Sequence, residues 1–151
     1  MRIKIFERLK QSFSNFVCGI HNLIKWLPVI WHDRDWDYCY LYNILYFKLK
    51  NMEQLHEEYS DLFVNSKKKI RQLKIAKNLA KRLFGENYIS NVIMGQEERY
   101  DLALKKFLRD DKNSTDLKWF ERCYEHADYM EEQDREYLFN LIKKHICGWW
   151  I

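Results

Sequence analysis

The feature that most constrains the fold is a regular spacing of apolar residues near the start of the chain. Large apolar side chains recur in alternating steps of three and four residues, at Phe6, Leu9, Phe13, Phe16, Ile20, Leu23 and Leu27. This spacing is the a/d pattern of a coiled-coil seam, and it predicts a helix over residues 3–26. Pro28 predicts the end of this helix, because a residue that precedes proline is disfavoured in the helical conformation.

The seam formed by these residues allows three interpretations. It can pack within the chain's own bundle, or it can pair with a second copy as a dimer interface. It can also lie in the plane of a membrane, with basic residues facing anionic lipid: Arg2, Lys4, Arg8, Lys10 and Lys25. We expect packing against another long helix and a homo-oligomer. We expect no membrane span, because no apolar run of about 20 residues is present.

The rest of the chain also favours helices. It has 4 Gly and 1 Pro in 151 residues, and therefore lacks the turn residues that strands and hairpins need. Further helices are predicted over residues 36–60, 66–84, 96–109, 115–130 and 134–147, with a loop over 85–95. The predicted fold class is all-α: one domain over residues 1–151, a bundle of five to six helices with two long N-terminal helices.

The expected core is apolar, and the cysteines add to it. We expect six side chains to be buried: Leu41, Leu45, Leu49, Leu138, Leu141 and Ile142. Four cysteines, Cys18, Cys39, Cys123 and Cys147, form no C-x-x-C pair, so their scatter indicates small core residues in a reducing compartment. The 25 aromatic residues (6 Trp, 10 Tyr and 9 Phe) exceed what a small helical core usually holds, so some should line a pocket or an interface.

A charged and aromatic motif, W-H-D-R-D-W-D, occupies residues 31–37. It is not an EF-hand loop, since Tyr38 and Ile44 stand where that loop needs Gly and Glu. Aspartates here can cap the following helix, which is the structural interpretation. The functional interpretation is a ligand or partner site formed by Trp31, Asp33, Arg34, Trp36 and Asp37, in which Arg34 stacks on a planar ligand or pairs with an acidic partner.

We also expect this motif to form a junction between distant parts of the chain. In this hypothesis Asp35 and Asp37 fix the start of the second helix, while Trp31 and Trp36 pack against Trp149 and Trp150. Arg34 would then lie at the rim of a pocket.

The predicted helix over residues 66–84 carries the strongest charge signal. It has eight basic residues and no acidic one, and Lys74 and Lys81 are candidate ligands for phosphate. The alternative is that this helix pairs with the acidic stretch 121–136. A nucleic acid is a less favoured partner than a small anion, because the net charge is only +4.

No motif requires an enzyme. The sequence Glu53-Gln54-Leu55-His56 is a single Glu-x-x-His, and a di-metal site on helices would need a second copy. No cysteine or histidine stands in a recognisable nucleophile motif, and no glycine loop for phosphate is present. We therefore expect no catalytic residue, no metal and no cofactor, with a metal-dependent enzyme as the third-ranked alternative.

Two stretches resemble a group of small proteins encoded by tailed bacteriophages. The first is W-x-D-R-D-W-D together with the helix pattern that follows it. The residues that match this pattern are Tyr40, Leu41, Ile44, Leu45, Lys48, Leu49 and Met52. The second is D-R-E-Y-L-F-x-L-I-x-x-H-I-x-x-W-W, over residues 134–150. The resemblance implies a phage accessory protein in the host cytoplasm. We expect a non-enzymatic protein that sequesters a host-derived ligand; the most specific form of this expectation is a nucleotide-type immune signal. A module that inhibits a host protein is the alternative.

Overall fold

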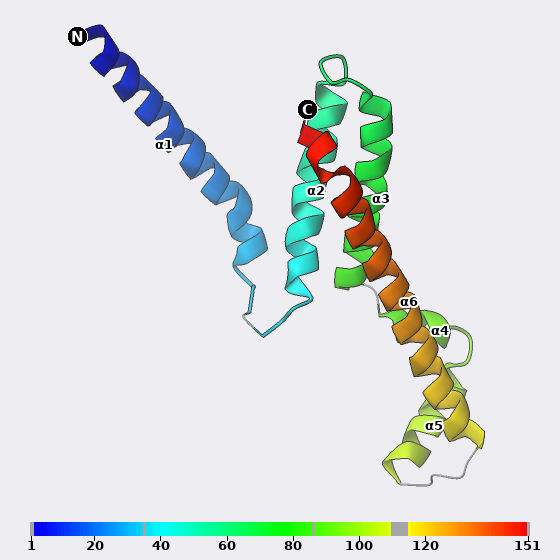
Figure 1. The fold of residues 1–151 in the computed structure, drawn as a ribbon. Helices are drawn as coiled ribbons and strands as arrows, with labels where there is room; N and C mark the ends of the chain where they lie inside the picture. Colours follow the sequence, from blue (N-terminus) through cyan, green and yellow to red (C-terminus); the bar gives the residue numbers. More distant parts are fainter. Residues whose placement is uncertain (1, 35, 86, 110–114, 151) are drawn as a thin grey trace.

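The computed structural model of the protein describes residues 2–34, 36–85, 87–109 and 115–150, except for the side chains of residues 2–6, 9 and 150. This part of the chain forms six α-helices, one 3-10 helix and no strand (Figure 1). The elements are α1 (Arg2–Ile30), α2 (Tyr40–Glu58), α3 (Ser66–Gly85), α4 (Tyr88–Val92), α5 (Glu97–Leu108), α6 (Thr115–His145) and η1 (Ile146–Trp150). The predicted all-α fold with two long N-terminal helices is confirmed.

The core lies where α2, α3 and the C-terminal half of α6 meet. Helices α2 and α3 run side by side, and α6 crosses them and continues past their end (Figure 1). Leu73 of α3 and Leu138 of α6 are fully buried at this crossing, with Ala76 and Ala80 of α3 between them and α2. Alanines at this face allow the helices to approach closely.

Two polar residues of α2 are buried with this core, and each has a partner from another element. The carboxylate of Glu53 accepts a hydrogen bond from Lys77 of α3, and Lys74 lies 4.0 Å from the other carboxylate oxygen. His56 contacts the main-chain oxygen of Trp149 at 2.7 Å. Burial of polar groups is tolerated when they are hydrogen-bonded, so these contacts fix which face of α2 points inward.

The inward face of α2 differs from the predicted one. Leu41 is exposed, so its predicted burial is wrong, and Tyr42 is buried in its place. Leu49 and Leu138 are buried as predicted, while Leu45, Leu141 and Ile142 are half-buried against the core. The inward face of α2 therefore keeps Leu49 and Met52 but is shifted toward Tyr42, Glu53 and His56 from the face that apolar periodicity alone predicts.

Helix α6 is one continuous helix of 31 residues where two were predicted. The stretch between the two predicted helices is polar, but its residues are good helix formers. Arg135 also donates a hydrogen bond over 2.7 Å to Glu131 one turn away and pairs with Glu132. The N-terminal part of α6 packs on α5 in a separate small cluster around Ala103, Leu117 and Phe120. The residues predicted to connect α5 and α6, including Ser114, lie outside the described residues.

Helix α1 projects away from the other helices and approaches α2 only at its C-terminal end (Figure 1). The prediction that its seam packs within the chain's own bundle is therefore wrong for the described seam residues, which are exposed. The helix also continues through Pro28 to Ile30. A proline two residues from the end of a helix removes one N–H donor where little helix remains to be disrupted. That residues 1–151 form a single domain stays a prediction.

Candidate interaction surface

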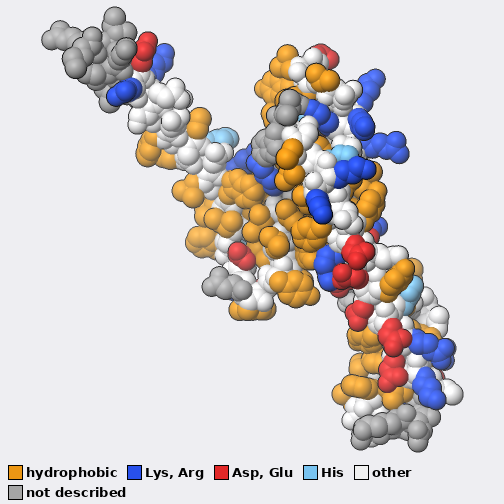
Figure 2. Space-filling model, viewed as in Figure 1, with side chains coloured by type: hydrophobic (Ala, Val, Ile, Leu, Met, Phe, Trp, Pro, Cys, Tyr) orange, Lys and Arg blue, Asp and Glu red, His pale blue; other side chains and the backbone are white. Residues whose placement is uncertain are grey.

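A stripe of exposed apolar side chains lies along α1. Phe13, Phe16 and Leu23 are 70%, 64% and 61% exposed; Ile20 and Leu27, the other described residues of the a/d pattern, are exposed as well, and so are their neighbours Val17 and Ile24. We call these seven residues the α1 seam. Figure 2 shows apolar side chains along the C-terminal half of α1 and on the part of the molecule beside it. Soluble chains rarely expose a contiguous apolar patch of this kind without using it for binding.

The seam is distinct from the contact that holds α1 to α2. The ring of Trp26 lies 4.7 Å from that of Phe47, centroid to centroid, in an edge-to-face arrangement. Val29, one turn further on, is the one buried residue among the described side chains of α1. Since each residue advances a helix by about 100°, Trp26 and Val29 point to a different side of α1 than Phe16 and Ile20. The attachment to α2 therefore leaves the seam open.

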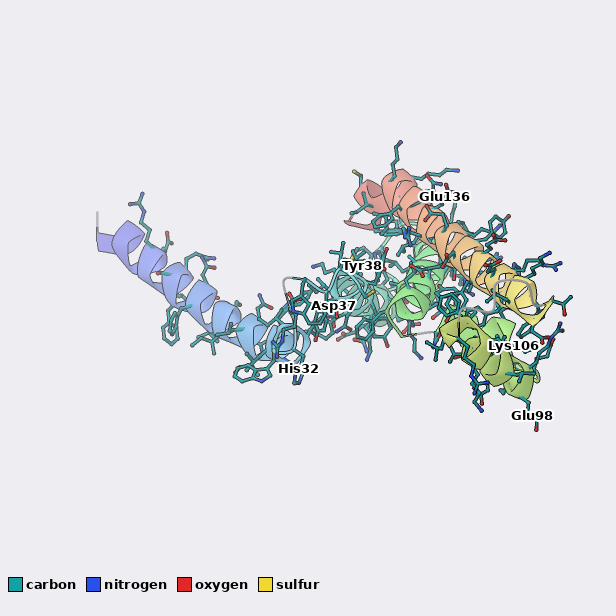
Figure 3. All side chains as sticks on the ribbon, turned by 90° about the horizontal axis from the view of Figure 1, so that it is seen from below. His32, Asp37, Tyr38, Glu98, Lys106 and Glu136 are labelled. Carbon is teal, nitrogen blue, oxygen red and sulfur yellow. The ribbon has the colours of Figure 1, made fainter. Side chains whose placement is uncertain are left out.

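The residues of the W-H-D-R-D-W-D motif lie on the connection between α1 and α2. Asp33 and Arg34 are exposed, and the Arg34 guanidinium donates a hydrogen bond to the main-chain oxygen of Asp33 at 3.0 Å. Asp37 accepts a hydrogen bond from the N–H of Cys39 at 3.1 Å, just before α2 begins (Figure 3). This is a turn ahead of the helix and not a cap: α2 begins after Cys39 with no side-chain cap hydrogen bond, so the predicted capping by Asp37 is wrong. The predicted role of Asp35 lies outside the described residues.

The predicted junction between tryptophans is wrong. Trp31 and Trp36 are 68% and 82% exposed, whereas Trp149 is 3% exposed and contacts His56. His56 lies 16 residues after Tyr40, so Trp149 sits about 24 Å along α2 from the end that follows the motif. The side chain of Trp150 lies outside the described residues. The C-terminal segment instead contacts the buried imidazole of His56, to which the sequence assigned no role.

The basic face of α3 is partly neutralised by neighbouring acids. Lys74 and Lys77 approach Glu53, and Arg82 pairs with Asp134 of α6, which also accepts a hydrogen bond from the Tyr88 hydroxyl at 2.8 Å. Lys81 is exposed. The pairing of α3 with the acidic stretch thus occurs at Asp134. The structure does not bring Lys74 together with Arg34, since Lys74 lies near Glu53 in the middle of α2.

A second apolar surface, which the sequence did not single out, lies between α5 and α6. Leu104, Phe107, Phe120 and Tyr124 line an open groove of about 480 Å³, with Glu121 and Glu125 at its edge. The hydroxyls of Tyr100 and Tyr124 are 2.7 Å apart beside it. This hydrogen bond, followed by burial, raises the pKa of Tyr100 to about 12. Figure 3 labels Glu98 and Lys106 on α5, which borders the groove.

Other classes of site find little support in the described residues. Within these ranges no three side chains of the His, Cys, Asp and Glu types gather as a metal site would require. Glu53 and His56, the single Glu-x-x-His pair, are both engaged in contacts that hold the helices together. Cys123 is buried, and burial raises the pKa of its thiol, which disfavours the reactive thiolate. No helix described here is both long and apolar enough to cross a bilayer.

Comparison of the chain with protein-family models, with curated proteins and with solved structures finds no match.

Proposed function

We propose that this protein is a binding protein that acts through the α1 seam, and that a second copy of the chain is the first partner of this seam. The observation that carries the proposal is the exposure of the a/d residues along α1. This helix contacts α2 near Trp26, at its C-terminal end. An a/d pattern is complementary to another helix with the same pattern, because each side chain enters a hole between four residues of the partner. A second α1 has that pattern.

The energy available from covering the seam fits a dimer. Burying an exposed Leu or Phe side chain stabilises by about 1.5–3 kcal/mol, and the seam residues are each roughly half exposed or more. Each chain therefore gains on the order of 5 kcal/mol from burial of the seam. Two chains together gain about 10 kcal/mol. Since association costs about 4–15 kcal/mol in lost translational and rotational freedom, gain and cost are of similar size, and we expect a dimer that forms reversibly.

Charge favours antiparallel pairing of the two helices. Four basic residues lie within the first ten residues, at Arg2, Lys4, Arg8 and Lys10, and only Glu7 opposes them. Parallel helices would bring these two basic ends together, whereas antiparallel helices keep them apart and also oppose the helix dipoles. The resemblance to small tailed-phage proteins supports a role for such a dimer as an accessory protein inside a bacterium.

The test is the molar mass in solution, measured by light scattering over a range of concentrations. The parent protein should be a dimer at high concentration, and Phe16→Asp should be a monomer with the helices of the body intact by circular dichroism. Asn15→Asp is the matched control, since it adds the same charge one residue away on the polar side of α1, and it should dimerise like the parent. A parent protein that is monomeric at every concentration would contradict the second copy as partner.

A further inference from the structure

A basic cavity lies where the first turns of α3 meet the end of α6 and η1. Its volume is about 200 Å³, and its walls include Asn65, Lys68, Lys69, Gln72, Lys144 and His145. None of the described residues that line it is acidic. We call it the α3–α6 pocket. It is separate from the α1 seam, and it contains neither Lys74 nor Lys81.

The walls of this pocket are fixed by buried polar contacts. The buried Ser66 hydroxyl donates a hydrogen bond to the main-chain oxygen of His56 at 3.2 Å, which holds the start of α3 against α2. The indole N–H of Trp149 donates to the side-chain oxygen of Gln72 at 3.2 Å, which holds η1 against α3. Asn65 turns the chain into α3 with a φ of 58°, a left-handed conformation that Asn tolerates. The pocket is thus formed before any ligand arrives.

The contact with Trp149 also sets what Gln72 can offer. Since the side-chain oxygen of Gln72 accepts the indole N–H, its NH2 group remains to donate. The lysine side chains of the pocket have three donors each and no acceptor. The pocket therefore presents mainly hydrogen-bond donors and positive charge.

The position of the lysines in α3 argues against a purely structural role. Lys67 and Lys68 lie in the first turn of the helix, which contains no acidic residue. The amino end of a helix carries the positive end of its dipole, so lysines at this end lower the stability of the helix. Lys143 and Lys144, in the last turn of α6, do complement the dipole of their own helix. An anion in the pocket would interact favourably with Lys68, with Lys144 and with the start of α3.

From these observations we infer that the α3–α6 pocket binds the phosphoryl groups of a small phosphate ligand. A cavity of about 200 Å³ is smaller than the roughly 300–1,000 Å³ of sites that enclose a whole drug-sized molecule. One or two phosphoryl groups therefore enter, and any remainder of the ligand lies outside. Inorganic pyrophosphate and the phosphate chain of a nucleoside triphosphate share this chemistry.

Isothermal titration calorimetry with inorganic pyrophosphate, ATP and adenosine, at constant ionic strength, tests this inference on the full chain. Pyrophosphate and ATP should bind saturably and adenosine should not. Lys68→Gln and Lys144→Gln should each weaken pyrophosphate binding about tenfold, the usual effect of losing one charge-assisted hydrogen bond. Lys81→Gln is the control, because it removes the same charge from an exposed position of α3 outside the pocket, and it should change the affinity less than twofold.

The outcomes separate the ligand sources and the failures. Similar affinities for pyrophosphate and ATP would mean that the protein recognises the phosphate chain alone. Clearly tighter binding of ATP would mean that its nucleoside makes further contacts outside the pocket. Both results support the inference. Absence of saturable binding at millimolar pyrophosphate would overturn it, provided that circular dichroism shows a folded protein. Equal weakening by all three variants, or tighter binding of single-stranded RNA that depends equally on Lys81, would assign the lysines to a diffuse basic surface and also overturn it.

Discussion

The imidazole of His56 donates a hydrogen bond from Nε2 to the main-chain carbonyl oxygen of Trp149, over 2.7 Å and across 93 positions of the sequence. A carbonyl oxygen can only accept, so Nε2 carries a proton. The other ring nitrogen, Nδ1, is buried without a hydrogen-bond partner among the described residues. This one bond joins α2 to η1 and closes one end of the core.

Replacement of His56 by Leu should lower the free energy of unfolding by about 1–3 kcal/mol, because a buried carbonyl group loses its donor. His56→Gln keeps an N–H donor and should lose less. Urea unfolding followed by circular dichroism measures both, with Gln54→Leu as a control at an exposed position of the same helix. Equal losses in the Leu and Gln variants would mean that ring packing, and not the hydrogen bond, stabilises this position.

Replacement of Lys77 by Met should destabilise the protein by about 3 kcal/mol, because the buried carboxylate of Glu53 would lose its closest cation. Lys74 is 4.0 Å from that carboxylate and would compensate only in part. The double variant Glu53→Gln, Lys77→Met should be more stable than Lys77→Met alone, since no buried charge remains. A double-mutant cycle by chemical denaturation measures this coupling, and a double variant as unstable as the sum of the single variants would contradict it.

Replacement of Leu138 by Ala should cost about 2–5 kcal/mol, the usual range for a fully buried leucine that leaves a cavity. Leu41→Ala removes the same atoms from an exposed position of α2 and should change the stability by less than about 0.5 kcal/mol. Thermal and urea unfolding of the two variants side by side measure the difference. Similar losses would show that Leu41 is covered in solution, by a second copy or by another element.

The pKa of Tyr100 gives a prediction at high pH. Its pKa lies at about 12 in the folded protein, against 10.0 for a free tyrosine, because the neutral hydroxyl is hydrogen-bonded to Tyr124. The folded state therefore holds its proton more tightly, and the resulting stabilisation is complete below about pH 10 and is lost as the pH rises to about 12. Tyr124→Phe should shift the late tyrosinate absorbance toward lower pH. An unchanged titration curve in that variant would contradict this origin of the shift.

Local signals in the sequence were sufficient to predict α3. Ser66 and Gly85 mark its ends, and the prediction of 66–84 differs from the observed helix by one residue. The predicted break within α6 failed for a physical reason: the apolar periodicity lapses there, but the ion pairs of Arg135 with Glu131 and Glu132 stabilise the helix. Apolar periodicity detects the burial of a helix, and an exposed helical segment gives no such signal.

The inward face of α2 depended on residues far away in the sequence. Periodicity alone favours Leu41 and Leu55 as core residues, yet both are exposed while Glu53 and His56 are buried. A buried carboxylate and a buried imidazole are tolerated only beside Lys77 and the carbonyl group of Trp149, and nothing local to α2 indicates those partners. For the same reason, the α3–α6 pocket could not be predicted, since it combines Lys68 and Lys69 with Lys144, which lies about 75 positions further along the chain.

In the proposed dimer, the attachment of α1 through Trp26 and Val29 alone makes the fold of α1 depend on protein concentration. Within a single chain the described side chains of α1 before Trp26 are all exposed, and isolated helices in water are only marginally stable. Whatever covers the seam therefore also supplies the free energy that keeps α1 helical, so folding of this segment and its association form one linked equilibrium. Dilution should accordingly reduce the helical content of α1 while the body, from α2 onward, keeps its structure.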